Sequence, residues 1–125
     1  MTEVLIKSVS PYAEYDGAIF SYKVTCILNN RRELIFLDEK PYDLTELIHQ
    51  KVFIELTTSY IGEDMRCKYP FEGEIEYIDS IGKYFFISDY LKVVVPKEIL
   101  KYSNIKLNEK KEYCFDDFIL NRLDK

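Results

Sequence analysis

The stretch 18-AIFSYKVTCILNNRRELIFLD-38 carries the pattern that decides the fold. Across residues 18–28, apolar or aromatic side chains recur at every second position, and Lys23 and Thr25 lie on the opposite face. Period-two alternation of this length predicts a long, half-buried antiparallel strand. The two asparagines that follow tolerate a left-handed backbone and predict a turn, so residues 33–38 are expected to form the return strand.

Two adjacent arginines, Arg31 and Arg32, fall at the tip of this predicted hairpin. The simpler interpretation is that they keep an exposed turn in water. The alternative is that they contact a partner, because arginine is enriched where proteins bind one another. The sequence leaves both interpretations open.

The same alternation recurs along the chain. Strands are predicted at Val4–Val9, 51–61 and 90–96, with a second hairpin that turns at Asp79 to Gly82. Residues 10–17 are expected to form a turn-rich connection, and residues 62–73 to form a loop bounded by two glycines.

Helical signals are short. Asp43 and Glu46 have the spacing of a helix N-terminus, which predicts one or two turns between Asp43 and Gln50. A further helical turn is expected after Pro96, and residues 112–123 fit either a strand or a helix.

About seven short strands with regular turns indicate an all-β protein with one or two short helices. The strands are expected to form a small antiparallel barrel, with a sandwich as the alternative, in a single domain spanning residues 1–125. A short helix between strands makes the pattern resemble an OB-like barrel more than an immunoglobulin-like sandwich. This resemblance concerns the fold, and a fold does not fix a function.

Composition supports a folded, acidic protein. The hydrophobic fraction of 47%, with only 4 glycines and 4 prolines, is typical of a globular domain, and the net charge of −5 disfavours a general nucleic-acid binder. The charge is uneven, with a balance of −4 over residues 63–79 and of +4 over residues 92–111. These two segments cancel if the fold brings them together, and otherwise they make the molecule dipolar.

The cysteines and the N-terminal sequence predict a cytoplasmic protein. Cys26, Cys67 and Cys114 are far apart, and an odd number without a CxxC motif indicates reduced thiols, with a disulfide as the alternative. The first ten residues lack the features of a signal peptide, and no apolar run is long enough for a membrane span. Oligomeric state is left open.

Catalytic signals are weak. His49 is the single histidine, Cys67 is a candidate thiolate beside two basic residues, and Glu74 and Glu76 share a strand face that suits a hard cation or acid–base chemistry. No histidine cluster or glycine-rich phosphate loop is present. We therefore expect no cofactor, no metal and no enzymatic activity, with an enzyme using Cys67 or paired carboxylates as the second alternative.

A non-enzymatic binding module that acts through a protein–protein interface is the expected function, in an inhibitor, immunity-type or adaptor role. The first alternative is an OB-type protein that binds single-stranded nucleic acid through aromatic side chains and basic residues. The candidate partner-binding residues combine arginines with aromatic side chains and one methionine, and they are Arg31, Arg32, Tyr60, Met65, Arg66, Tyr69 and Phe71.

Overall fold

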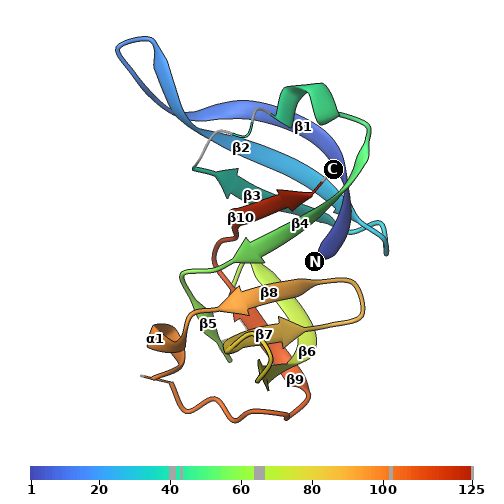
Figure 1. The fold of residues 1–125 in the computed structure, drawn as a ribbon, viewed down its shortest axis with the longest axis vertical. Coiled ribbons are helices and arrows are strands. Elements are labelled where there is room, and N and C mark those ends of the chain that lie inside the picture. Colours follow the sequence, from blue (N-terminus) through green and yellow to red (C-terminus); the bar gives the residue numbers. More distant parts are fainter. Residues whose placement is uncertain (40–41, 43, 64–66, 102, 125) are drawn as a thin grey trace. The chain divides into compact units, whose positions relative to one another are not determined.

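The computed structural model describes residues 1–39, 42, 44–63, 67–101 and 103–124, and their fold is built from β-strands (Figure 1). Two short helical segments interrupt them, the 3-10 turn η1 (Leu44–Leu47) and α1 (Lys97–Leu100). The strands of the described residues are β1 (Thr2–Tyr15), β2 (Ala18–Leu28), β3 (Glu33–Asp38), β4 (Lys51–Thr57), β5 (Ile61–Gly62), β6 (Tyr69–Ile78), β7 (Lys83–Ile87), β8 (Lys92–Val95), β9 (Lys111–Phe115) and β10 (Ile119–Asp124).

The chain divides into two compact units by the density of its internal contacts. Unit 1 comprises Met1–Leu56 and Ile119–Lys125, and unit 2 comprises Thr57–Phe118. Unit 2 is therefore inserted in the sequence between β4 and β10. A single domain spanning residues 1–125 stays a prediction, since compactness alone does not show whether the units fold together.

Unit 1 is a closed, five-stranded β-barrel. Its strand order is β1-β2-β3-β10-β4, and the pairing of β1 with β4 closes the circle. β1 pairs antiparallel with β2 and with β4, whereas β3 and β10 pair in parallel at Leu37 and Ile119. This connectivity, with η1 between β3 and β4, is that of an OB-like barrel and confirms the predicted all-β class.

The core of unit 1 follows from the alternation along its strands, which turns every second side chain inward. It is almost entirely aliphatic, and Phe36 is the one aromatic side chain among its buried hydrophobic residues that the structure describes. Those residues are Val4, Ile6, Val24, Cys26, Leu28, Leu34, Phe36, Leu44, Leu47, Val52, Ile54, Leu56 and Leu120.

The β1–β2 hairpin is longer than the sequence predicts. β1 continues to Tyr15, so the expected turn-rich connection over residues 10–17 is wrong, and the turn is confined to Asp16 and Gly17. Both have positive φ, 50° and 79°, as in a type I′ hairpin turn. The shared inward face predicted for residues 18–28 is also wrong at its start, because Phe20 is exposed where the hairpin runs beyond the barrel.

Unit 2 contains a five-stranded sheet in the order β8-β7-β6-β9-β5. β6 pairs with β9 along its first half and with β7 along its second half, and Gly73 lies where it changes partner. The loop predicted for residues 62–73 is therefore wrong from Tyr69 onward. The hairpin turn at Asp79 to Gly82 is confirmed, with Gly82 N donating to Ile78 O at 2.8 Å.

Aromatic rings fill the core of unit 2. They lie at tilted or edge-to-face angles, for example Phe86 against Phe115 with ring centroids 4.9 Å apart. The buried aromatic residues described in this unit are Tyr69, Phe71, Phe86, Tyr113, Phe115 and Phe118. Residues 112–123, which the sequence left undecided, form parts of β9 and β10 with a break at 116–118.

A disulfide joins Cys67 and Cys114, so the prediction of reduced thiols is wrong for these two residues. Their Cα atoms are 5.4 Å apart, a separation suited to a disulfide. They are 47 residues apart in sequence, and only the pairing of β6 with β9, which sets Pro70 opposite Cys114, brings them together. Cys26 is free and buried as predicted, and the cytoplasmic location loses the support of its thiol argument.

Candidate interaction surfaces

The Arg31–Arg32 tip lies at the surface, as predicted, with Arg31 exposed and Arg32 partly exposed. Arg31 N donates to Leu28 O, and Leu28 N donates to Arg32 O, both at 2.9 Å. This closes a three-residue loop in which Arg31 takes a left-handed backbone with φ of 70°. The sequence assigned that role to the asparagines, but Asn30 instead accepts a bond from Arg32 N at Oδ1, at 3.1 Å.

The second group of predicted contact residues does not form one surface. Tyr60 is 41% exposed, whereas Tyr69 and Phe71 are only 8% and 7% exposed, so their assignment to an exposed loop is wrong. Both belong to β6, where alternation turns them into the aromatic core, and the Tyr69 ring lies 5.3 Å from that of Phe118. The predicted contacts Met65 and Arg66 lie outside the described residues.

A projecting ribbon in unit 1 is the surface that sequence reasoning missed. Residues 8–21, which we call the arm, form the outer half of the β1–β2 hairpin and extend past the other strands of unit 1 (Figure 1, blue). The arm carries Tyr12, Tyr15 and Phe20, which are 61%, 70% and 56% exposed. These are the three most exposed aromatic side chains in the described part of the chain. The missed signal was the Asp16–Gly17 pair between aromatic residues, a strong hairpin marker.

Two of these rings lie where the pairing of the arm is irregular. The register between β1 and β2 shifts at three places, which leave Lys7, Tyr12 and Phe20 without directly opposed residues. A bulge re-aims a side chain and twists the strand, which also discourages another strand from adding to the edge. The register shifts therefore make the edges of the arm poor templates for an added strand.

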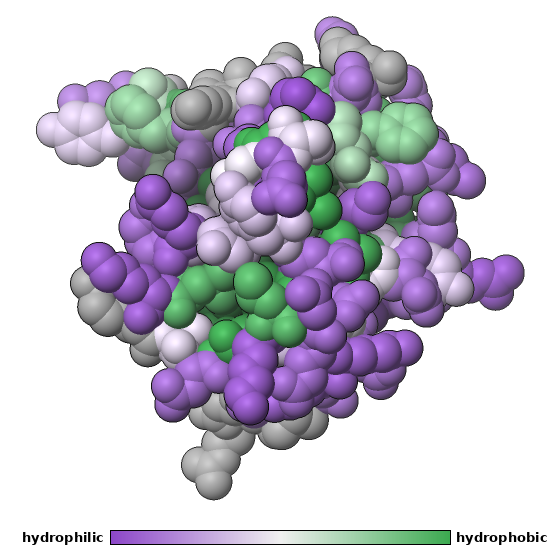
Figure 2. Space-filling model, turned by 60° about the horizontal axis from the view of Figure 1, so that its bottom comes forward, coloured by the Kyte–Doolittle hydropathy of each residue, from purple (hydrophilic) through white to green (hydrophobic). Residues whose placement is uncertain are grey.

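A hollow of about 590 Å³ lies on the surface of unit 2. Its apolar wall is formed by Tyr84, Leu100, Ile105 and Leu107. Its charged rim is formed by Lys97, Glu98 and Lys101. The molecular face drawn in Figure 2 shows hydrophobic surface framed by hydrophilic side chains. The volume lies within the range of about 300–1,000 Å³ that is common for binding pockets.

Hydrogen bonds hold the wall of this hollow in place. Ser103 donates from Oγ to Leu100 O at 3.0 Å, and Ile105 N donates back to Ser103 Oγ at 3.5 Å. Asn108 N donates to Ile75 O at 2.8 Å, which ties the segment after Leu107 to β6. The apolar wall is therefore supported by the backbone on both sides.

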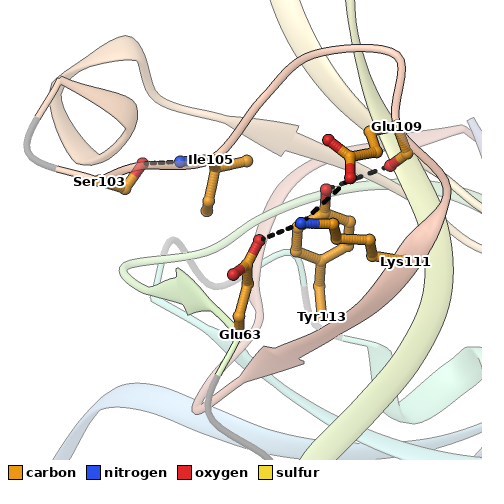
Figure 3. A network of polar contacts seen from close by, with 6 residues as sticks. All are labelled: Glu63, Ser103, Ile105, Glu109, Lys111 and Tyr113. Atoms are coloured by element: carbon orange, nitrogen blue, oxygen red, sulfur yellow. Dashed lines mark hydrogen bonds and ion pairs between the residues drawn. The ribbon is translucent and has the colours of Figure 1, made fainter.

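The acidic and basic segments found in the sequence meet in unit 2. Lys110 pairs with Glu72 at 3.4 Å, and Lys111 Nζ lies 3.3 Å from Glu63 and 3.2 Å from Glu109 (Figure 3). The hydrogen bonds from Lys111 to Glu109 and Glu63 raise its pKa. These pairs cancel charge at the β9 end of the basic segment.

Neither cysteine considered for chemistry is an accessible free thiol. Burial raises the pKa of the Cys26 thiol to about 12, so it is not a nucleophile, and Cys67 is held in the disulfide. His49 is exposed and has a backbone φ of 70°. Its backbone N–H donates to Ile6 O at 2.7 Å, so His49 lies where the chain leaves the η1 segment. Among the described residues, no three histidine, cysteine or carboxylate side chains are grouped as metal ligands.

No family model, curated protein or solved structure matches this chain. In the described part of the chain, no helix has the length and apolar character needed to cross a membrane.

Proposed function

We propose that this protein is a non-enzymatic binding module whose arm docks into an apolar cleft of a protein partner. The observation that carries the proposal is the exposure of Tyr12, Tyr15 and Phe20 on a ribbon that projects from a closed barrel. Apolar side chains favour folding in proportion to the surface that they remove from water, so three rings that stay mostly exposed contribute little to the stability of the fold. Aromatic side chains are instead enriched at the centres of protein interfaces.

Charge favours a protein over a nucleic acid as the partner. The arm carries Glu14 and Asp16 and no basic residue, so it repels phosphate groups. The arginines of the Arg31–Arg32 tip follow the other end of β2. An extended strand of this length places that end about 30 Å from the turn of the arm. An acidic, aromatic arm suits a protein surface that places lysine or arginine side chains beside an apolar cleft.

The proposal is tested by placing a photoreactive amino acid at Tyr15 and irradiating the protein in a native lysate. A matched control carries the same group at Tyr90, an aromatic residue of unit 2 that is 47% exposed. We expect a protein cross-link specific to Tyr15 that weakens as salt is raised, because salt screens the acidic tip.

The aromatic contribution is tested separately with Tyr12→Ser combined with Phe20→Ser. We expect this variant to lose the Tyr15 cross-link while keeping the thermal stability of the parent, since both rings are solvated. Nucleic acid as the cross-linked species would favour the OB-type alternative. Equal cross-linking from Tyr15 and Tyr90 would overturn the docking role of the arm.

A further inference from the structure

The hollow of unit 2 has the chemistry that the arm requires of its partner. Its wall offers four apolar or aromatic side chains, and the segment around it, residues 97–106, carries three lysines and one glutamate. Lys97, Lys101 and Lys106 are exposed, and the salt bridges found among the described residues do not include them. Residues 97–106 thus have a charge balance of +2 beside an open apolar wall.

The arm has the opposite character on every count. The arm projects and carries three exposed rings, whereas the wall is hollow. The charge balance of the arm is −2, and that of residues 97–106 is +2. Both surfaces are preformed, the arm by the β1–β2 ladder and the wall by the hydrogen bonds of Ser103 and Asn108. Preformed partners lose little conformational freedom on association.

We propose that the arm of one copy of this chain docks into the hollow of a second copy. The rings of Tyr12 and Tyr15 pack against Leu100 and Leu107, and Glu14 and Asp16 pair with lysines of the rim. This inference rests on the proposed docking role of the arm and adds the identity of the partner.

The contact joins two different surfaces. Two copies therefore either exchange arms reciprocally in a closed dimer or associate head to tail into rings or open chains. The average mass in solution is expected to rise with concentration to that of a dimer or of a larger assembly. Raising the salt concentration is expected to lower it, because the paired charges are close to the surface.

The test reverses the charges on one surface at a time. The arm variant combines Glu14→Lys with Asp16→Lys, and the hollow variant combines Lys97→Glu with Lys101→Glu. Each side chain is exposed, so folding is expected to survive. The control, Lys23→Glu with Lys83→Glu, shifts the net charge as much as the hollow variant does but changes exposed lysines elsewhere.

Sedimentation equilibrium measures the average mass of each sample at protein concentrations up to the millimolar range. We expect the parent and the control to self-associate, each variant alone to do so at least about tenfold more weakly, and an equimolar mixture of the two variants to recover association. Recovery identifies the contact, because both variants keep a net negative charge and do not attract one another generally.

Two results would overturn this inference: a parent that stays monomeric throughout, or a mixture of variants that does not recover association. In either case, a salt-sensitive cross-link from Tyr15 to a different protein would leave the docking role of the arm intact. Absence of any arm-specific cross-link would remove the proposed function itself, so the two failures are distinguishable.

Discussion

The two units stabilise β-structure in different ways. Unit 1 closes its sheet by pairing β1 with β4 and needs only an aliphatic core with a single buried aromatic ring, that of Phe36. In unit 2, no strand pair among the described residues joins β5 back to β8, and the unit combines a cluster of aromatic rings with the Cys67–Cys114 disulfide. The sheet of unit 2, which is not closed in this way, thus combines large aromatic rings with a cross-link, whereas the sheet of unit 1 combines aliphatic side chains with a closed circle of paired strands.

The difference also separates the kinds of surface that the units offer. Barrel closure fixes β1 and β2 at their base, which allows the same strands to continue outward as the arm. Unit 2 instead leaves the segment after β8 only partly packed, since none of the residues of α1 is buried. One unit therefore presents a projection and the other a hollow.

Reduction of the Cys67–Cys114 disulfide is expected to have the largest effect and to confine it to unit 2. Removing a cross-link across 47 residues lowers the free energy of unfolding by about 4 kcal/mol on the chain-entropy estimate. Hydrogen exchange resolved by segment should show faster exchange in β6 and β9 with β2 and β3 unchanged.

Cys67→Ser is the matched control for this experiment, because a reductant should not change its exchange any further. Cys26 gives an internal reference for unit 1. Since burial raises the pKa of its thiol to about 12, alkylation at pH 8 should leave it unmodified while unit 1 stays folded. Loss of protection in both units on reduction would contradict the division between them.

Gly73→Ala is expected to have the next largest effect, again in unit 2. A Cβ at Gly73 would lie 2.4 Å from the carbonyl oxygen of Ile87, and backbone on a paired strand does not move aside cheaply. We expect a loss of about 3 kcal/mol in chemical denaturation.

Gly62→Ala provides the contrast within the same unit. Its Cβ would lie 2.2 Å from the hydroxyl oxygen of Tyr60, the far end of a side chain that is 41% exposed and free to swing away. The loss should stay below about 1 kcal/mol. Equal losses in the free energy of unfolding for the two variants would contradict a special requirement for glycine at position 73, where the backbone of β6 lies close to that of Ile87.

Arg31→Gly should give the smallest effect, and in unit 1 it should be favourable. Arg31 has φ of 70°, a backbone conformation that costs a non-glycine residue about 1 kcal/mol, and glycine removes that cost. Thermal unfolding should therefore shift upward by a few degrees.

The control for Arg31→Gly is Arg31→Ala combined with Arg32→Ala. This pair should change stability by no more than about 0.5 kcal/mol, because alanine keeps the strained backbone and the side chains lie at a surface turn. A large loss in the control would show that the tip is packed against other residues.

Local sequence signals were sufficient for several elements of both units. Alternation predicted the β2–β3 hairpin and the buried position of Cys26, and turn and cap residues predicted the turn at Asp79 to Gly82 and a short helical segment before β4, because each depends on neighbouring residues. These signals failed for Tyr69 and Phe71, where the flanking glycines indicated a loop. Gly73 instead serves a close approach between strands, which sequence spacing does not reveal.

Residue patterning was enough to establish the β class and which side chains share a strand face, since side-chain direction alternates along an extended backbone. Which strand closes the barrel, which cysteines join and where a strand leaves the core depended on the packing of the whole chain. Those outcomes depend on residues far apart in the chain, such as Cys67 and Cys114 or Val4 and Val52. For the same reason, Phe20 has the sequence pattern of a core residue but is exposed, because it lies in the part of β2 that extends beyond its pairing with β3.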